Sequence, residues 1–161
     1  METKFNFNSQ ICTTREQSER LLALGLKKET ADMFHAAIHI GTKIVGYQVS
    51  PIYNEYSFEI FPDDIPAWSL NRLWELTPKV IFTKPSLYLA MCENSVIYCA
   101  GDNNEEYEQS FSRQVSLYDN IIDCIKWLIK EGYFNKEYLI KITSQGNTST
   151  GSAWTVENGI F

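Results

Sequence analysis

The sequence predicts an α+β fold in a single domain, with one largely antiparallel sheet of about five to seven strands and three helices packed mainly on one face. Three segments have the start and stop signals of helices, and short aromatic or β-branched segments between them alternate as strands do. The chain has 161 residues, of which 44% are hydrophobic, and this suits one packed domain. We assign residues 1–142 to this domain.

The first predicted helix covers about residues 14–24. Gly25 stands where a left-handed C-cap residue belongs. Residues 1–12 alternate weakly and form either an edge strand or a segment that lies over the core. Two alternative capping boxes open the helix, Thr13 with Glu16 or Thr14 with Gln17.

Two further helices are predicted. Ser69 caps the second, which ends at Leu76 just before a proline, because a residue preceding proline resists helical dihedral angles. The third covers about residues 117–131 and has a continuous apolar face. Ser116 and Asp119 have the spacing of a capping box at its start.

The strands fall between these helices. One hairpin is expected to turn at Gly41-Thr42-Lys43 and a second at Glu93-Asn94. The first of the strands has an alternative interpretation as a continuing helix. The predicted strands are Phe34–Ile40, Ile44–Val49, Tyr56–Phe61, Val80–Thr83, Ser86–Cys92 and Ser95–Ala100.

Residues 143–161 are predicted to form a polar, flexible C-terminal tail, because the segment begins with a run of small and polar residues. The tail ends in apolar residues, which dock either on the domain or on another molecule. These apolar residues are Trp154, Val156, Ile160 and Phe161.

Charge and hydropathy narrow the choice of partners. Twenty acidic and 14 basic residues give a net charge of −6, so direct nucleic-acid binding is disfavoured and a protein partner is expected. No segment has the length and hydropathy of a signal peptide or a membrane span, so we expect a cytoplasmic location and no membrane partner. The sequence does not determine the oligomeric state. The cysteines are expected to be free thiols, at Cys12, Cys92, Cys99 and Cys124.

A metal site was weighed at Asp32, His35 and His39. Two histidines four residues apart share one face of a helix or a strand, and an aspartate precedes them. The HExxH pattern is absent and no third ligand is required by the spacing, so ordinary polar positions beside a core are the favoured interpretation. We expect no cofactor.

The loop that begins at Asp102 is acidic. Its spacing does not match a calcium loop, because the sixth position is Tyr107 rather than glycine. If this loop has a function, contact with a basic surface of a partner is the simplest one, through Asp102, Glu105 and Glu106.

Candidates for catalysis are few. No GxSxG motif is present, and Cys12 is expected to be the most exposed thiol, without a histidine placed by sequence to activate it. Trp68 lies just before a helix cap and is predicted to anchor either a neighbouring element or a binding partner. An aromatic ligand cleft is a further alternative, with Trp68, Trp74, Trp127, Tyr88 and Tyr98 as its candidate residues.

Several segments resemble an uncharacterised family of small proteins from gut Bacteroidetes and their phages and conjugative elements. The segments are 14–26 (TREQSERLLALGL), 30–33 (TADM), 66–70 (PAWSL), 73–78 (LWELTP) and 124–129 (CIKWLI). The family brings no known activity, cofactor or catalytic residue. The resemblance implies a setting of mobile DNA.

Together these observations favour a non-catalytic accessory or protein-interaction protein of a phage or mobile element. One alternative is an acidic inhibitor or immunity-type protein that mimics nucleic acid or blocks a basic enzyme. Another is a small-ligand binder, or an enzyme, with an aromatic cleft. No residue is assigned a catalytic role.

Overall fold

A computed structural model describes residues 9–52, 62–101, 108–114 and 116–141. The predicted strand Tyr56–Phe61, the acidic loop and the C-terminal tail lie outside these ranges. In the described part, no helix combines the length and the apolar character needed to cross a membrane.

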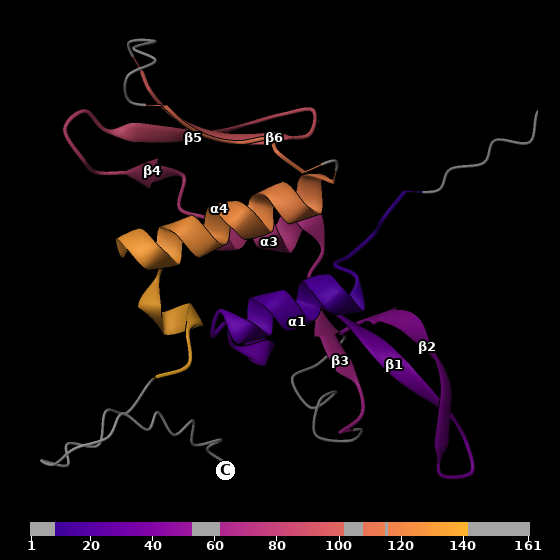
Figure 1. The fold of residues 1–161 in the computed structure, drawn as a ribbon. Coiled ribbons are helices and arrows are strands. Elements are labelled where there is room, and N and C mark those ends of the chain that lie inside the picture. Colours follow the sequence, from indigo (N-terminus) through magenta and orange to yellow (C-terminus); the bar gives the residue numbers. More distant parts are fainter. Residues whose placement is uncertain (1–8, 53–61, 102–107, 115, 142–161) are drawn as a thin grey trace, which may run out of the picture.

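The predicted α+β class is confirmed, with three α-helices and two antiparallel sheets in one domain (Figure 1). One sheet has three strands in the order β2-β1-β3, and the other has four in the order β4-β5-β6-β7. The helices are α1 (Arg15–Ala23), α3 (Leu70–Leu76) and α4 (Leu117–Glu131), with 3-10 turns η1 (Lys28–Thr30) and η3 (Lys136–Tyr138). The strands are β1 (Met33–Ile40), β2 (Lys43–Pro51), β3 (Ile65–Ala67), β4 (Val80–Ile81), β5 (Leu87–Cys92), β6 (Ser95–Ala100) and β7 (Gln109–Phe111).

The prediction of one sheet with helices on one face needs correction, because the helices lie between two sheets. Figure 1 shows β4, β5 and β6 on one side of α3 and α4, while β1, β2 and β3 lie beyond α1 on the other side. Within the described ranges, neither sheet reaches the predicted five strands. The sequence could not show this division, because alternation identifies a strand without identifying its neighbours.

The predicted signals at the ends of α1 and α4 are realised locally. Of the two alternative capping boxes, the one that forms joins Thr14 and Gln17. Gly25, with φ of 88°, lets α1 end in a Schellman motif, in which the N–H of Leu26 donates to the carbonyl of Leu21 at 3.2 Å. Gly132 ends α4 in the same left-handed conformation, with φ of 79°.

The two hairpins form where they were expected. β1 and β2 pair across a two-residue turn, with an irregularity in register between Ile38 and His39, so the helical alternative for β1 is wrong. β5 and β6 pair across Glu93-Asn94, where Glu93 adopts a φ of 47°. The short strands β3 and β7 were not predicted, because three residues give too little alternation to recognise.

The core lies between the four-stranded sheet and the three helices α1, α3 and α4, which we call the helix layer. Side chains of α1, α3 and α4 meet the inward side chains of β6, and Trp68 closes the core beside α1 and η1. The fully buried apolar side chains are Leu21, Leu26, Trp68, Leu73, Val96, Tyr98, Ile121, Ile122, Ile125 and Leu128.

Candidate functional site

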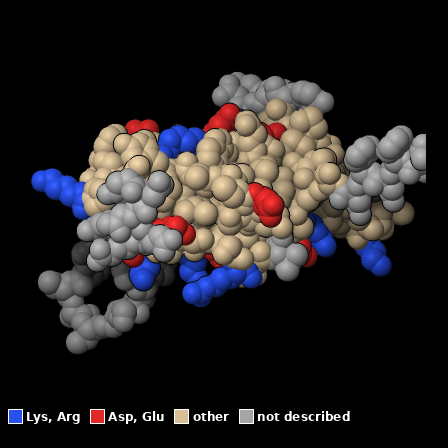
Figure 2. Space-filling model, turned by 90° about the horizontal axis from the view of Figure 1, so that it is seen from above, with Lys and Arg blue, Asp and Glu red and all other residues tan. Residues whose placement is uncertain are grey.

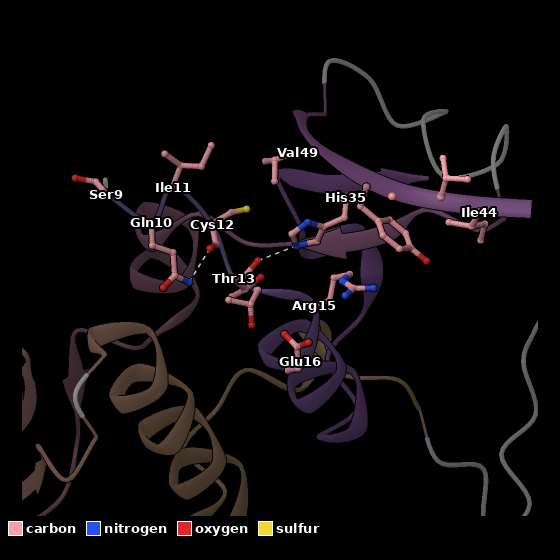
Figure 3. A pocket seen from close by; sticks show the side chains of 14 residues that line it. Ser9, Gln10, Ile11, Cys12, Thr13, Arg15, Glu16, His35, Ile44 and Val49 are labelled. Atoms are coloured by element: carbon pink, nitrogen blue, oxygen red, sulfur yellow. Dashed lines mark hydrogen bonds between the residues drawn. The ribbon is translucent and has the colours of Figure 1, made fainter. Parts of the chain in front are cut away.

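The candidate site is a cleft of about 720 Å³ between α1 and the three-stranded sheet. This volume lies in the range of about 300–1,000 Å³ that is usual for ligand clefts. Residues 9–16 form one wall, while His35 and residues of β2 form the other. Figure 3 shows Ser9 to Thr13 along one side, Val49, His35 and Ile44 on the sheet, and the side chains of Arg15 and Glu16 on α1.

Thr13 fixes the wall that precedes α1. Its N–H donates to the carbonyl of Trp68 at 2.8 Å, and its hydroxyl accepts from the N–H of Trp68 at 3.0 Å. The same hydroxyl lies 2.8 Å from the hydroxyl of Ser18 on α1. Thr13 is fully buried, so these bonds are shielded from water and hold the wall against β3 and α1.

His35 ties this wall to β1. Its Nε2 lies 2.9 Å from the carbonyl oxygen of Thr13, and because a carbonyl only accepts, Nε2 carries a proton. On the same wall, the Gln10 side chain donates to the carbonyl of Cys12 at 2.7 Å (Figure 3). The cleft therefore has a preformed wall.

The opposite wall runs along β2, which has β1 on one side and no described strand on the other. The consecutive residues Ile44, Val45, Gly46 and Tyr47 all line the cleft. Tyr47 and Val49 lie on the same face of the sheet as His35, and the irregularity in register between β1 and β2 puts Ile44 on that face as well, so the cleft lies over this face of the sheet, at its β2 side. An edge strand presents backbone N–H and C=O groups to an added strand.

Gly46 is a notable residue of this edge. Its φ is not positive, and a Cβ built there would meet only the Ile38 side chain, at 4.0 Å. Neither the backbone conformation nor a neighbouring atom therefore requires glycine. Glycine weakens a strand interior and often marks a place where another backbone approaches closely.

Charged groups of both signs line the cleft. The Arg15 guanidinium lies over the Tyr47 ring, 4.7 Å from its centroid. The pKa of Glu16 is lowered, first by a hydrogen bond from its own backbone N–H and then by the Thr14 hydroxyl, so this carboxylate stays ionised at neutral pH. The cleft thus offers a cation on an aromatic ring, an anion and a strand edge.

Cys12 is not the exposed thiol that was predicted. Its side chain is 4% exposed, whereas Cys92 is the exposed one. The structure does place Cys12 and His35 in the same cleft, a proximity that no sequence pattern predicts. Burial, and then the nearby charge of Asp32, raises the pKa of the Cys12 thiol, so it stays protonated and is a poor nucleophile.

The three residues weighed as metal ligands have separate hydrogen-bond partners. Asp32 accepts from the backbone N–H and the hydroxyl of Ser69, at 2.8 and 2.5 Å. His35 bonds to Thr13, and His39 pairs with Asp63 at 3.0 Å. Within the described ranges, no three acidic, histidine or cysteine side chains come together in a way that could hold a metal ion.

Trp68 lies in the core, so its side chain has no exposed surface that could bind a partner. Its side chain is 0% exposed and its Nε1–H donates to the Thr30 hydroxyl at 3.0 Å. The ring anchors neighbouring elements, which was one of its two predicted roles. Of the other aromatic candidates, Tyr98 is also buried, whereas Tyr88 is half exposed on the far side of the four-stranded sheet.

The other two tryptophans lie apart from this cleft. Trp127 packs against Tyr98 and Tyr133, with ring centroids 5.8 and 5.7 Å apart. Trp74 borders a small apolar cleft beside Met91 and lies under the Lys79 ammonium. The five aromatic candidates therefore do not line one common cleft.

The acidic candidates Asp102, Glu105 and Glu106 lie outside the described residues, so the proposed contact with a basic partner remains a prediction from sequence. Sequence reasoning did not identify the cleft itself. Its one local signal was Gly46 within an otherwise strand-like segment. Comparisons with protein-family models, with curated proteins and with solved structures found no match to this chain.

Proposed function

We propose that this protein is a non-catalytic protein-interaction protein that binds an extended segment of a protein partner in the cleft along β2. The observation that carries the proposal is a preformed cleft at the side of the sheet where β2 has no neighbouring strand among the described residues. In β-strand addition, backbone hydrogen bonds supply affinity and neighbouring pockets select side chains. Both parts are present in this cleft.

The chemistry of the cleft favours binding over catalysis. The Cys12 thiol is held protonated, and His35 is hydrogen-bonded to a carbonyl of the cleft wall. Arg15 on Tyr47 supplies a site for a polar or acidic group of the partner, while Val45 and Val49 supply apolar contact. This combination suits a peptide with alternating apolar and polar side chains.

Gly46 supports the close approach of a second backbone. A side chain fits there without a clash and would lie beside Ile38, the residue paired with Gly46, so the glycine leaves the backbone of β2 uncovered at this position. The resemblance to small proteins of gut Bacteroidetes and their mobile elements places the partner, within this proposal, in a phage or conjugative system. The inhibitor alternative rests on the acidic residues Asp102, Glu105 and Glu106 and makes no use of Gly46.

The test is selection from a random-peptide display library on the immobilised full chain, compared with Gly46→Val. Valine suits a strand, so this variant is expected to melt at or above the temperature of the wild type while recovering at least about tenfold less peptide. Gln48→Val is the matched control, because Gln48 is exposed on the same strand but does not line the cleft. It should recover the same peptides as the wild type.

Three outcomes would contradict the proposal: no enrichment by the wild type, equal enrichment by Gly46→Val, or loss of binding with Gln48→Val. The double variant Glu105→Lys, Glu106→Lys tests the inhibitor alternative, in which charge reversal removes binding to a basic partner without lowering the melting temperature. Removal of residues 1–8 tests whether the chain itself supplies the occupant. In that case, the shortened protein recovers peptide that the full chain does not, and the partner proposal fails.

A further inference from the structure

A second surface lies on the opposite side of the helix layer. The four-stranded sheet packs on the helices through the inward side chains of β6, namely Val96, Tyr98 and Ala100, all of which are buried. The alternating positions point away from the helices and are more exposed. We call this surface the outer face, and its β5 and β6 members are Tyr88, Ala90, Cys92, Ser95, Ile97 and Cys99.

The outer face carries no charge at these six positions, although the chain has a net charge of −6. Figure 2 looks down on this side of the molecule and shows mostly neutral surface, with an acidic side chain near the middle and most other charged side chains towards the rim. Tyr88 is 50% exposed, and Phe82 beside β4 is 89% exposed. Apolar surface left in water in this way is typical of an interaction site.

The arrangement of large and small side chains makes the outer face complementary to itself. Tyr88 pairs with Cys99 across the strands, and Ala90 pairs with Ile97. The two large side chains therefore occupy diagonally opposite corners, and the two small ones occupy the others. A two-fold axis between β5 and β6, parallel to the strands, places Tyr88 over Cys99 of a second copy and Ile97 over Ala90 of that copy.

We propose that a second copy of this chain docks on the outer face and forms a symmetric dimer, with the two sheets packed face to face as in a β-sandwich. Two acidic copies repel each other least where neither presents a charge. Strand spacings give β5 and β6 a face of roughly 20 by 10 Å, and the shorter β4 and β7 add less than half of that, so the face covers on the order of 300 Å² per copy. Stable interfaces bury about 800 Å² per partner, so the dimer is expected to form at micromolar concentrations or above.

The test measures mass against concentration under reducing conditions, by sedimentation or light scattering. The wild type should shift from 18.6 kDa towards twice that mass as its concentration rises. Ala90→Lys places a charge at the centre of the outer face and should keep the monomer mass throughout. Gln48→Lys makes the same charge change on the other sheet and should dimerise as the wild type does.

A second measurement does not depend on how well Ala90→Lys folds. In the wild type, a thiol reagent should modify Cys92 and Cys99 more slowly as the protein concentration rises, because the dimer covers both thiols. Ile97→Ala should need a protein concentration at least about fivefold higher for the same protection. A wild type that stays monomeric overturns the proposal. So does a dimer that survives a well-folded Ala90→Lys, or one that is lost with Gln48→Lys.

Discussion

At the scale of single residues, Asn120 shows how a buried polar side chain holds elements together. It is 1% exposed and uses its whole amide group. Its Oδ1 accepts from the N–H of Gln114 at 3.0 Å, while its Nδ2 donates to the carbonyls of Asn94 and Gln114, at 2.5 and 2.9 Å. These bonds join α4 to the β5–β6 turn and to the segment before α4.

Replacing Asn120 should therefore be costly. Asn120→Ala leaves backbone groups at Asn94 and Gln114 without partners, and we expect the free energy of unfolding to fall by about 2–3 kcal/mol. Asn71→Ala is the control, because Asn71 is exposed and bonds only within α3, to Glu75 at 3.0 Å. It should change stability by less than about 0.5 kcal/mol. Urea denaturation measures the free energy of unfolding of both variants. Equally small losses of stability in Asn120→Ala and Asn71→Ala would contradict this account.

The buried thiol of Cys124 predicts a dependence of stability on pH. Burial raises its pKa from 9.0 to about 12. Above pH 9 the unfolded chain loses this proton while the folded chain keeps it, so the stabilising contribution, complete below pH 9, is lost as pH rises towards 12. The expected decline is about 1.4 kcal/mol per pH unit in that interval.

Urea denaturation at a series of alkaline pH values measures this slope. Cys124→Ala should decline less steeply than the wild type, whatever its stability at neutral pH. The pKa of Tyr98 is raised by burial and then by the charge of Cys124, so Tyr98 adds to the alkaline decline in both proteins but adds less in Cys124→Ala, which widens the expected difference. Identical slopes would show that the Cys124 thiol ionises alike in both states.

At the scale of elements, α4 begins in a way that the sequence predicted only in part. Its bounds match the predicted 117–131, but Ser116 makes no side-chain cap hydrogen bond. Asp119 instead accepts from Gln17 and Arg20 on α1, at 3.0 and 2.5 Å. A capping box and a contact between helices use the same kinds of residue, so only the position of α1 distinguishes them.

This contact predicts unequal effects of two substitutions. Asp119→Ala removes the bonds that Asp119 accepts from Gln17 and Arg20, while Arg20 keeps its bridge to Asp123, and should lower the free energy of unfolding by about 1 kcal/mol, a modest value because Arg20 is 44% exposed. Ser116→Ala should change it by less than about 0.5 kcal/mol. A double-mutant cycle that combines Asp119→Ala with Arg20→Ala measures the coupling energy between Asp119 and Arg20. The absence of coupling would mean that this salt bridge contributes nothing to the free energy of unfolding.

Local signals explain why the elements were predictable and the layers were not. Capping, proline and glycine signals lie within a few residues of the structure they determine, as at Thr14, Ser69 and Gly132. The assignment of strands to two sheets depends on distant contacts, such as that between Thr13 and Trp68. The cleft depends on the same contact, so the sequence alone could not identify it.

At the scale of the whole molecule, the two proposed surfaces lie on opposite sides of the helix layer (Figure 1). The cleft borders β2 in the three-stranded sheet, and the outer face belongs to the four-stranded sheet. A dimer through the outer face therefore leaves both clefts open. Two weak peptide sites in one particle bind a clustered partner more strongly than either site alone, because the second contact forms at a high effective concentration.

This arrangement predicts a density-dependent dissociation rate for a peptide recovered in the display selection. On a densely coated surface the wild type, applied at a concentration that forms dimers, should dissociate at least about tenfold more slowly than Ala90→Lys. On a sparse surface the two should dissociate at the same rate, because Ala90 lies outside the cleft. Surface plasmon resonance at two densities makes the measurement. A difference that persists at low density would mean that Ala90 alters the cleft itself, and equal rates at high density would mean that the two clefts of a dimer do not act together.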